Sequence, residues 1–217
     1  MRAKKTTNAN NKNIMDLQKY AERRGPIEER FRAKPPVPGT ERTHLSPSGR
    51  FSLQTAVHAE GPCTWAYSRG IVRHVTSQHV IADIRRNYSA FWHAWVERPD
   101  GEYLLCGEDY QGYNVIDLQR EQNIFTFPDE AFDGMGFCWA AVYPSPSGRL
   151  LAVDGCYWAC QYDLVIYDFT DPTRSPLPEL ARFENLDKFK GWRDDECLDY
   201  VLEEGIEGTW KAASNTL

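Results

Sequence analysis

Residues 136–169 have the sequence GFCWAAVYPSPSGRLLAVDGCYWACQYDLVIYDF. Three runs rich in β-branched and aromatic residues, 137–143, 149–154 and 162–169, are typical of β-strands, because such side chains fit a pleated surface. The segment PSPSG at 144–148 separates the first two runs. Proline sets φ at the second position of a turn and glycine supplies positive φ, so this segment predicts a tight turn between antiparallel strands.

The same kind of turn recurs along the chain, as SPSGR at 46–50, RPDGE at 98–102 and SPSGR at 145–149. A degenerate copy without the Pro-x-Gly, GWRDDE at 191–196, precedes the strand-like run CLDYV at 197–201. Successive turns are about 50 residues apart, and periods of about 40–50 residues with four strands are typical of propeller blades.

The strands that follow the turns also match, with VIDL at 115–118 and IYDF at 166–169. The Pro-Ser/Asp-Gly turn, the apolar strand after it and these later strands together resemble the blades of WD40-like and related β-propellers. The resemblance covers about residues 42–205 at the level of the repeat. The Gly-His and Trp-Asp dipeptides of WD40 repeats are absent from the sequence, so no specific family is assigned.

The repeat predicts an all-β fold of four-stranded antiparallel units, arranged as a propeller or a partial propeller. A β-sandwich or curved sheet is the alternative, because three full units and a partial one are few for closing a ring. The last unit spans only about 25 residues, which is too few for four strands of ordinary length. A closed ring would need the N-terminal segment to complete it, or a second copy of the chain in a dimer.

Residues 1–40 are predicted to form an N-terminal arm, and residues 41–217 the β-repeat domain. The start, 1–13, is polar and rich in Asn, and predicts disorder. Apolar residues recur with helical spacing within 14–32, where Gly25-Pro26 is expected to break the helix. The segment PPVPG at 35–39 predicts a semi-rigid linker.

Composition narrows the classes of function. The chain has 217 residues, 41% of them hydrophobic, and a net charge of −6. An acidic chain is a poor binder of nucleic acid or of anionic membranes, which need clustered Lys and Arg. No apolar run approaches the roughly 20 residues that span a bilayer, and the basic start lacks the apolar stretch of a signal peptide. The six scattered Cys fit reduced thiols, so a cytoplasmic location is expected.

The loop between the second and third strand of each unit is rich in aromatic and acidic residues: 60–67, 107–113 and 154–162. Equivalent units would bring these loops to one edge. Tyr and Trp give large contact areas with a polar group and dominate binding hot spots. The candidate binding residues are Trp65, Tyr67, Glu108, Asp109, Tyr110, Tyr113, Asp154, Tyr157 and Trp158.

This aromatic-acidic loop edge predicts a non-catalytic binding module for a protein partner or a small ring-bearing ligand. An inhibitor or immunity-type protein, which neutralises another protein, is one concrete version, and a homodimer is also compatible. The alternative interpretation is structural: the aromatic residues pack between adjacent units and the acids cap turns. No cofactor is predicted.

A hydrolase acting at the same edge is the alternative function. Glu108 and Asp109 are adjacent acids, and paired carboxylates can divide acid and base roles. Adjacent residues in an extended segment point apart, however, and His93, between two Trp, is expected in the core. The nucleophile-elbow, phosphate-loop and dinucleotide motifs are absent from the sequence, so catalysis is the less favoured class.

Two further groups of residues, one of cysteines and one of arginines, are candidate ligand sites. Cys156 and Cys160, with Cys63 in an equivalent loop, lack the Cys-x-x-Cys pairs or matched His of a zinc site, so no metal is predicted. Arg85 and Arg86 close a predicted strand and can clamp an anion. An ordinary surface strand end is the other interpretation of this pair.

Overall fold

The computed structural model describes residues 17–61, 63–158 and 160–213, and shows four antiparallel sheets and one α-helix. In each sheet, strands that are consecutive in the chain are neighbours. The predicted all-β fold of repeated antiparallel units with an N-terminal helix is therefore confirmed. The predicted disordered start, 1–13, lies outside the described residues.

The sheets follow one another along the chain. Sheet 1 contains β1 (Arg42–Leu45), β2 (Phe51–His58), β3 (Tyr67–His74) and β4 (Val80–Arg86). Sheet 2 contains β5 (His93–Arg98), β6 (Gly101–Cys106), β7 (Tyr113–Asp117) and β8 (Gln122–Thr126). Sheet 3 contains β9 (Phe137–Pro144), β10 (Leu150–Tyr157), β11 (Tyr162–Asp168) and β12 (Glu179–Phe183). Sheet 4 has only three strands, β13 (Leu186–Trp192), β14 (Cys197–Leu202) and β15 (Ile206–Lys211).

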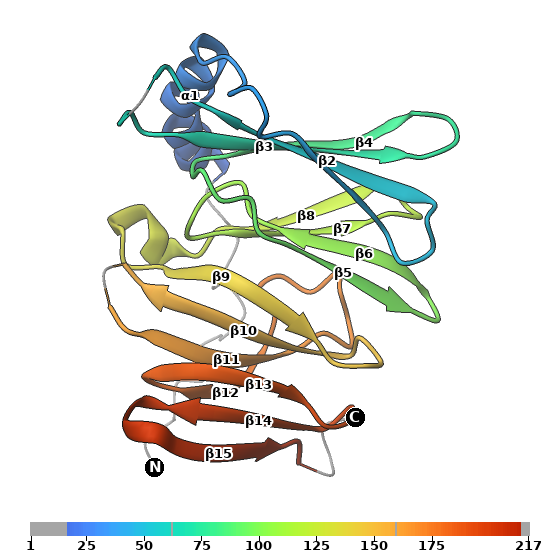
Figure 1. Ribbon diagram of the computed structural model, residues 1–217, viewed down its shortest axis with the longest axis vertical. Helices are drawn as coiled ribbons and strands as arrows, with labels where there is room; N and C mark the ends of the chain where they lie inside the picture. Colours follow the sequence, from blue (N-terminus) through green and yellow to red (C-terminus); the bar gives the residue numbers. More distant parts are fainter. Residues whose placement is uncertain (1–16, 62, 159, 214–217) are drawn as a thin grey trace, which may run out of the picture.

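The four sheets are stacked in chain order, with sheets 1 and 4 at opposite ends of the stack (Figure 1). This arrangement resembles consecutive blades that do not meet in a closed ring within the described part of the chain. Sheet 4 stops at three strands, as the short last unit predicted.

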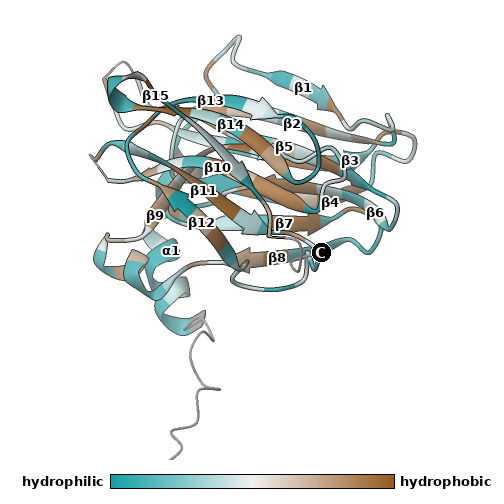
Figure 2. Cartoon of the chain, turned by 90° about the horizontal axis from the view of Figure 1, so that it is seen from below, coloured by the Kyte–Doolittle hydropathy of each residue, from teal (hydrophilic) through white to brown (hydrophobic). Residues whose placement is uncertain are grey.

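Three hydrophobic cores fill the spaces between successive sheets. Leu53 and Leu104 share the first core, Val96 and Val153 the second, and Leu164 and Leu198 the third. Strands β7 and β11 are covered on both faces, so nearly all of their residues are buried and their central residues, Val115-Ile116 and Leu164-Val165-Ile166, are apolar without alternation. Figure 2 shows hydrophobic residues gathered on the inner strands, whereas β1 and much of α1 are hydrophilic.

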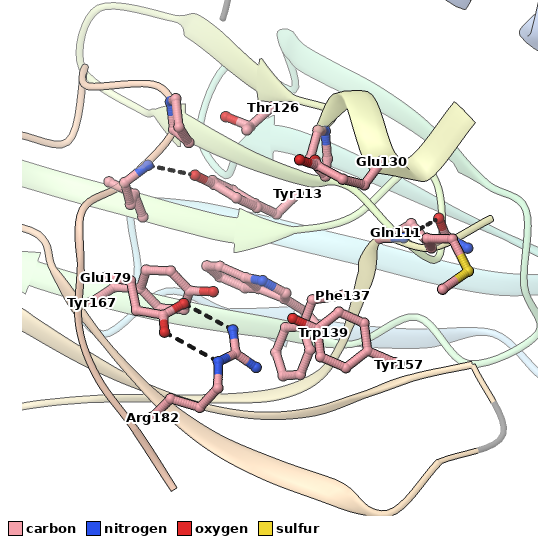
Figure 3. A pocket seen from close by; sticks show the side chains of 15 residues that line it. Gln111, Tyr113, Thr126, Glu130, Phe137, Trp139, Tyr157, Tyr167, Glu179 and Arg182 are labelled. Carbon is pink, nitrogen blue, oxygen red and sulfur yellow. Dashed lines mark hydrogen bonds and ion pairs between the residues drawn. The ribbon is translucent and has the colours of Figure 1, made fainter. Parts of the chain in front are cut away.

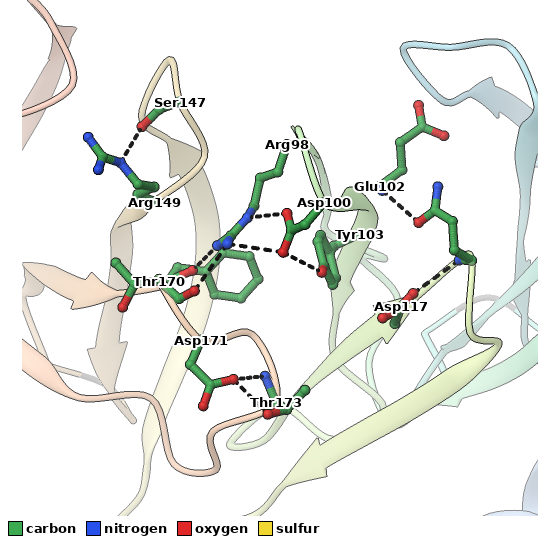
Figure 4. Close-up of polar contacts among 12 residues, drawn as sticks. Arg98, Asp100, Glu102, Tyr103, Asp117, Ser147, Arg149, Thr170, Asp171 and Thr173 are labelled. Atoms are coloured by element: carbon green, nitrogen blue, oxygen red, sulfur yellow. Dashed lines mark hydrogen bonds and ion pairs between the residues drawn. The ribbon is translucent and has the colours of Figure 1, made fainter. Parts of the chain in front are cut away.

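The repeated turns lie at one side of the stack, which we call the turn edge. In the first and third repeats, Ser46 and Ser145 make the same contacts: each hydroxyl accepts a hydrogen bond from the backbone N–H five residues later, at 3.3 and 3.2 Å. Gly148 has a φ of 67° and a Cβ there would lie 2.6 Å from Val96, so both the turn and the packing require glycine. Figure 4 shows other contacts of this edge, including the pairing of Arg98 with Asp100.

Helix α1 (Leu17–Ala33) runs through Gly25-Pro26 without a break, so the predicted interruption is wrong. Proline in a helix interior removes one hydrogen bond and crowds the preceding turn, but tertiary contacts override this local cost. Tyr20 and Phe31 are buried on either side of Pro26. Among the helices of the described segments, none is long and apolar enough to cross a membrane.

The segment predicted as a linker is hydrogen-bonded to the end of β2. The N–H of Val37 donates to the carbonyl of Val57 at 2.8 Å, and the N–H of Ala59 donates to the carbonyl of Pro35 at 3.3 Å. The division between an arm of 1–40 and a domain of 41–217 stays a prediction.

Candidate functional site

The loops between β2 and β3, β6 and β7, and β10 and β11 all emerge on the side opposite the turn edge (Figure 1). We call this side the loop edge. It also carries the connections β4–β5, β8–β9, β12–β13 and β14–β15, because each sheet is an antiparallel meander. Helix α1 lies beside the loop edge at sheets 1 and 2.

Exposed aromatic side chains gather on the loop edge. Trp158 is 55% exposed and Trp65 is 48% exposed. Two ring contacts join neighbouring loops: Tyr110 and Trp158 have centroids 5.3 Å apart, and Trp65 and Tyr88 have centroids 5.9 Å apart. Over the described residues, the exposed aromatic side chains are Trp65, Tyr88, Tyr157, Trp158 and Tyr162.

Tyr67 and Tyr113 are buried. The ring of Tyr67 packs edge-on against Phe31 of α1, with centroids 6.0 Å apart. Tyr113 stacks on Trp139 at 4.2 Å, and its hydroxyl accepts a hydrogen bond from the backbone N–H of Leu177 at 2.8 Å. These two tyrosines therefore hold elements together below the surface of the edge.

Glu108 and Asp109 are covered by α1. The hydroxyl of Tyr20 donates to Glu108 at 2.5 Å, and Arg23 Nε lies 3.5 Å from the buried carboxylate of Asp109. Burial raises the pKa of Glu108 above its ordinary value. This acid pair is engaged within the chain, which leaves the hydrolase hypothesis without an observation in its favour.

Other acids take the exposed places on the loop edge. They lie mainly in the short 3-10 helices η1 (Asp129–Asp133) and η2 (Glu203–Gly205) and in the neighbouring connections. The exposed carboxylates in these segments include Glu60, Asp129, Glu130, Asp133, Glu184, Glu203 and Glu204. Sequence reasoning missed most of them because the connections between sheets were not assigned to the same edge as the loops within sheets.

Asp154 belongs to β10, where it pairs with Leu164 of β11. The side chain is half-buried, and its Oδ1 has no hydrogen-bond partner among the described residues. Burial raises the pKa of Asp154 to about 6. The side chain points to the face of sheet 3 that packs on sheet 4, since Ala152, two residues earlier on the same face of β10, lies in the core between these sheets.

A cleft of about 370 Å³ opens between sheets 2 and 3, and we call it the Arg182 cleft (Figure 3). Arg182 donates to Glu179 at 2.8 Å and to Asp163 at 3.0 Å, and its guanidinium lies 4.7 Å from the ring centroid of Phe137. Five aromatic rings line the cleft: Tyr113, Phe137, Trp139, Tyr157 and Tyr167.

A second, smaller hollow of about 210 Å³ lies at the same edge, and we call it the aromatic pocket. It is lined by Tyr110 and Trp158 of the predicted site and by the buried Arg86. Trp139 lines both this pocket and the Arg182 cleft. The remaining lining residues are Tyr88, Ala90, Trp92, Cys138, Ala140, Cys156 and Tyr162.

The cysteines and histidines form no metal site in the part of the chain that the structure describes. Cys63 and Cys160 are exposed free thiols, and Cys156 is a half-buried one. His93 stacks against His44 with centroids 4.4 Å apart, and burial lowers its pKa. These groups are not arranged together around a reacting centre.

Comparison with known proteins gives one relative by sequence. A protein of Acanthamoeba polyphaga mimivirus, described as uncharacterised, is 38% identical over 138 residues, which is 64% of this chain and 54% of that protein. The chain thus spans about half the length of the curated relative it matches. No family model matches.

Solved structures show distant similarity. Sqt1 from Chaetomium thermophilum, bound to the N-terminus of a ribosomal protein, is 14% identical with a TM-score of 0.47, covering 81% of this chain and 44% of that one. A eukaryotic initiation factor is 12% identical with a TM-score of 0.35, covering 79% of this chain and 52% of that one.

Proposed function

We propose that this chain is a non-catalytic protein-binding module whose loop edge docks a partner of basic character. The observation that carries the proposal is the gathering of Trp65, Trp158 and the other exposed aromatic residues on one side of the stack. Contiguous exposed apolar surface rimmed by polar groups marks interaction sites, and Trp and Tyr dominate binding hot spots.

The sign of the charge favours a basic partner. Exposed carboxylates from η1, η2 and Glu184 lie on the same edge as the aromatic residues. Complementary charge steers association and suppresses wrong partners. An inhibitor or immunity-type role, in which the chain covers a basic surface of another protein, is the specific form that we propose, and the net charge of −6 supports it.

Capture by immobilised protein from native lysate tests this proposal. The loop-edge variant carries Trp65→Ala and Trp158→Ala, and the matched control carries Leu45→Ala and Val80→Ala. Leu45 and Val80 are exposed to similar degrees, 61% and 41%, but flank turns at the turn edge. All variants must first melt cooperatively near the wild-type temperature.

We expect a partner that wild type and the control capture and the loop-edge variant loses. Glu203→Lys with Glu204→Lys should weaken the same capture, most strongly at low salt, because exposed charges are screened as ionic strength rises. Equal capture by the loop-edge variant and the control would move the binding surface elsewhere. Light scattering of the isolated chain shows whether a second copy is the partner.

A further inference from the structure

The charge that lines the aromatic pocket is positive. Arg86 is the basic residue among its described lining residues, and none of them is acidic. Burial raises the pKa of the Cys138 thiol to about 12 and also raises the pKa of Cys156, so both thiols are neutral at pH 7. A cationic ligand would meet repulsion here, and an anionic one would meet attraction.

Arg86 is buried, at 3% exposure, and its contacts are with neutral groups. Nε donates to the carbonyl of Ala90 at 2.9 Å, and Nη1 donates to the carbonyls of Gly107 and Asp109 at 2.9 and 2.8 Å. Within the described residues, no carboxylate forms an ion pair with it. Burial lowers the pKa of Arg86 to about 10, so the group still carries its charge at pH 7. The buried carboxylate of Asp109 attracts Arg86 without forming a direct ion pair, so the cost of burying this charge is only partly offset, and a bound anion would relieve the rest.

Trp92 supplies a second donor. Its indole Nε1 is buried and has no hydrogen-bond partner among the described residues. The Arg86 guanidinium lies 5.9 Å from the ring centroid of Trp92, so the two donors lie near each other. Because an indole N–H and a guanidinium can only donate, their ligand must offer acceptors.

The walls favour a flat ring. Tyr110 and Trp158 come from the loops of sheets 2 and 3 and contact each other with their ring planes tilted by 46°, and Tyr88, Trp139 and Tyr162 also line the pocket. Aromatic faces stack well on planar ligands. At about 210 Å³ the pocket is smaller than the roughly 300–1,000 Å³ that holds a drug-sized ligand, which limits the occupant to about one ring.

We propose that the aromatic pocket binds a small planar aromatic acid, whose carboxylate accepts hydrogen bonds from Arg86 and Trp92 and whose ring lies among Tyr110, Trp158 and Tyr162. The proposal goes beyond protein binding at the loop edge, because it needs no protein partner. It also gives the two residues of the Arg85-Arg86 motif different roles. Arg85 pairs with Glu28 of α1 at 2.5 Å, and Arg86 lines the pocket.

Calorimetry and ligand-observed NMR on the full chain test the proposal with benzoate as the probe. Benzamide has nearly the same shape without the charge, cyclohexanecarboxylate has the charge without the aromatic ring, and benzylammonium has the opposite charge. We expect benzoate to bind at least about tenfold more tightly than benzamide and benzylammonium, since a charge-assisted hydrogen bond contributes about that much. Benzoate should also bind more tightly than cyclohexanecarboxylate, whose ring cannot stack on aromatic faces. Benzoate that fails to bind the folded chain at 10 mM, or that binds no better than benzylammonium, overturns the proposal.

Variants locate the binding. Trp92→Phe keeps a six-membered aromatic ring but removes the indole N–H together with the five-membered ring, and should weaken benzoate roughly tenfold. Leu45→Ala removes an exposed apolar side chain at the turn edge, on the opposite side from the pocket, and should leave benzoate binding unchanged. If Arg86→Gln does not fold, Trp92→Phe is the variant that decides. If Trp92→Phe and wild type bind benzoate equally well, the aromatic pocket is not the benzoate site. A variant that loses only the capture of a protein partner contradicts nothing in this proposal, because the two binding events are separate.

Discussion

At the residue scale, Asp154 holds a carboxylate where its charge is disfavoured. Its folded pKa of about 6 lies above its ordinary value of 3.8 because burial penalises the ionised form. Between about pH 4 and pH 6 the folded state therefore binds more protons than the unfolded state. Stability falls as pH rises through this window and stays lower above it.

Asp154→Asn should raise the free energy of unfolding above pH 6 by on the order of 1 kcal/mol, a value reduced for the solvent that screens a half-buried group. The gain should vanish below about pH 4, where the wild-type carboxyl is protonated in both states. Urea unfolding at a series of pH values measures this. Asp163→Asn is the control, because Asp163 pairs with Arg182 at 3.0 Å and its loss should destabilise at neutral pH. A gain for Asp154→Asn that is independent of pH would contradict the explanation.

For some candidate residues the exposure is set by the local sequence, and for others it is set by contacts with residues far away in the sequence. Trp65 and Trp158 lie in loops and Tyr157 at the end of β10, and their exposure follows from local sequence. Glu108 and Asp109 looked equally exposed in sequence, but α1, some 80 residues earlier, covers them. Arg86 and Trp92 gained a role only when sheets 2 and 3 placed aromatic residues around them.

At the element scale, α1 shows a local rule overridden by packing. Pro26 lies in its interior, where it removes a backbone donor and crowds the preceding turn. On one side Arg24 donates to the carbonyl of Arg85 at 2.8 Å, and on the other Phe31 packs on His58 with centroids 4.5 Å apart. These contacts hold both halves of the helix on the β-sheets.

Pro26→Ala should protect the amides of 17–33 more strongly from hydrogen exchange and stabilise the docked helix by up to about 3 kcal/mol. Ala restores the missing N–H and relieves the crowding. Glu29→Ala, at an exposed position of the same helix, is the control for a general gain in helix propensity. Weaker protection in Pro26→Ala would mean that the proline shape is needed for docking.

At the scale of the whole molecule, the sheets differ in how well they are covered. Sheets 2 and 3 are packed on both faces, whereas sheet 4 packs on one face and presents a polar face with the Lys190–Glu207 ion pair at 2.6 Å. In stacked repeats each unit gains stability only from its neighbours. The terminal sheet therefore has fewer contacts to lose before it opens.

Leu198→Ala should cost about 2–5 kcal/mol and expose the amides of β13–β15 to hydrogen exchange before those of sheets 2 and 3. Leu198 is fully buried in the core between sheets 3 and 4. The same substitution at Leu104, fully buried between sheets 1 and 2, is the matched control and should lower protection in both of those sheets. Uniform loss of protection from Leu198→Ala would show that the stack unfolds as one unit.

The sequence predicted the repeat because its signals are local: the first three turns each carry their own Pro and Gly, and the first and third also carry a serine hydroxyl, at Ser46 and Ser145. It also predicted which loops are rich in aromatic residues. The pockets could not be predicted in the same way, because each is built from residues of different sheets, such as Tyr113 with Arg182. Their partners are fixed by how the sheets stack, which no single stretch of sequence encodes.

Trp139 stands between the Arg182 cleft and the aromatic pocket, and its indole contributes to the wall of each. It contacts Tyr113, Tyr167 and Trp92, with centroid distances of 4.2, 5.1 and 5.9 Å. Because one indole belongs to both walls, a ligand that displaced it from one side would change the shape of the hollow on the other side. Any such effect on the two affinities would be equal in both directions.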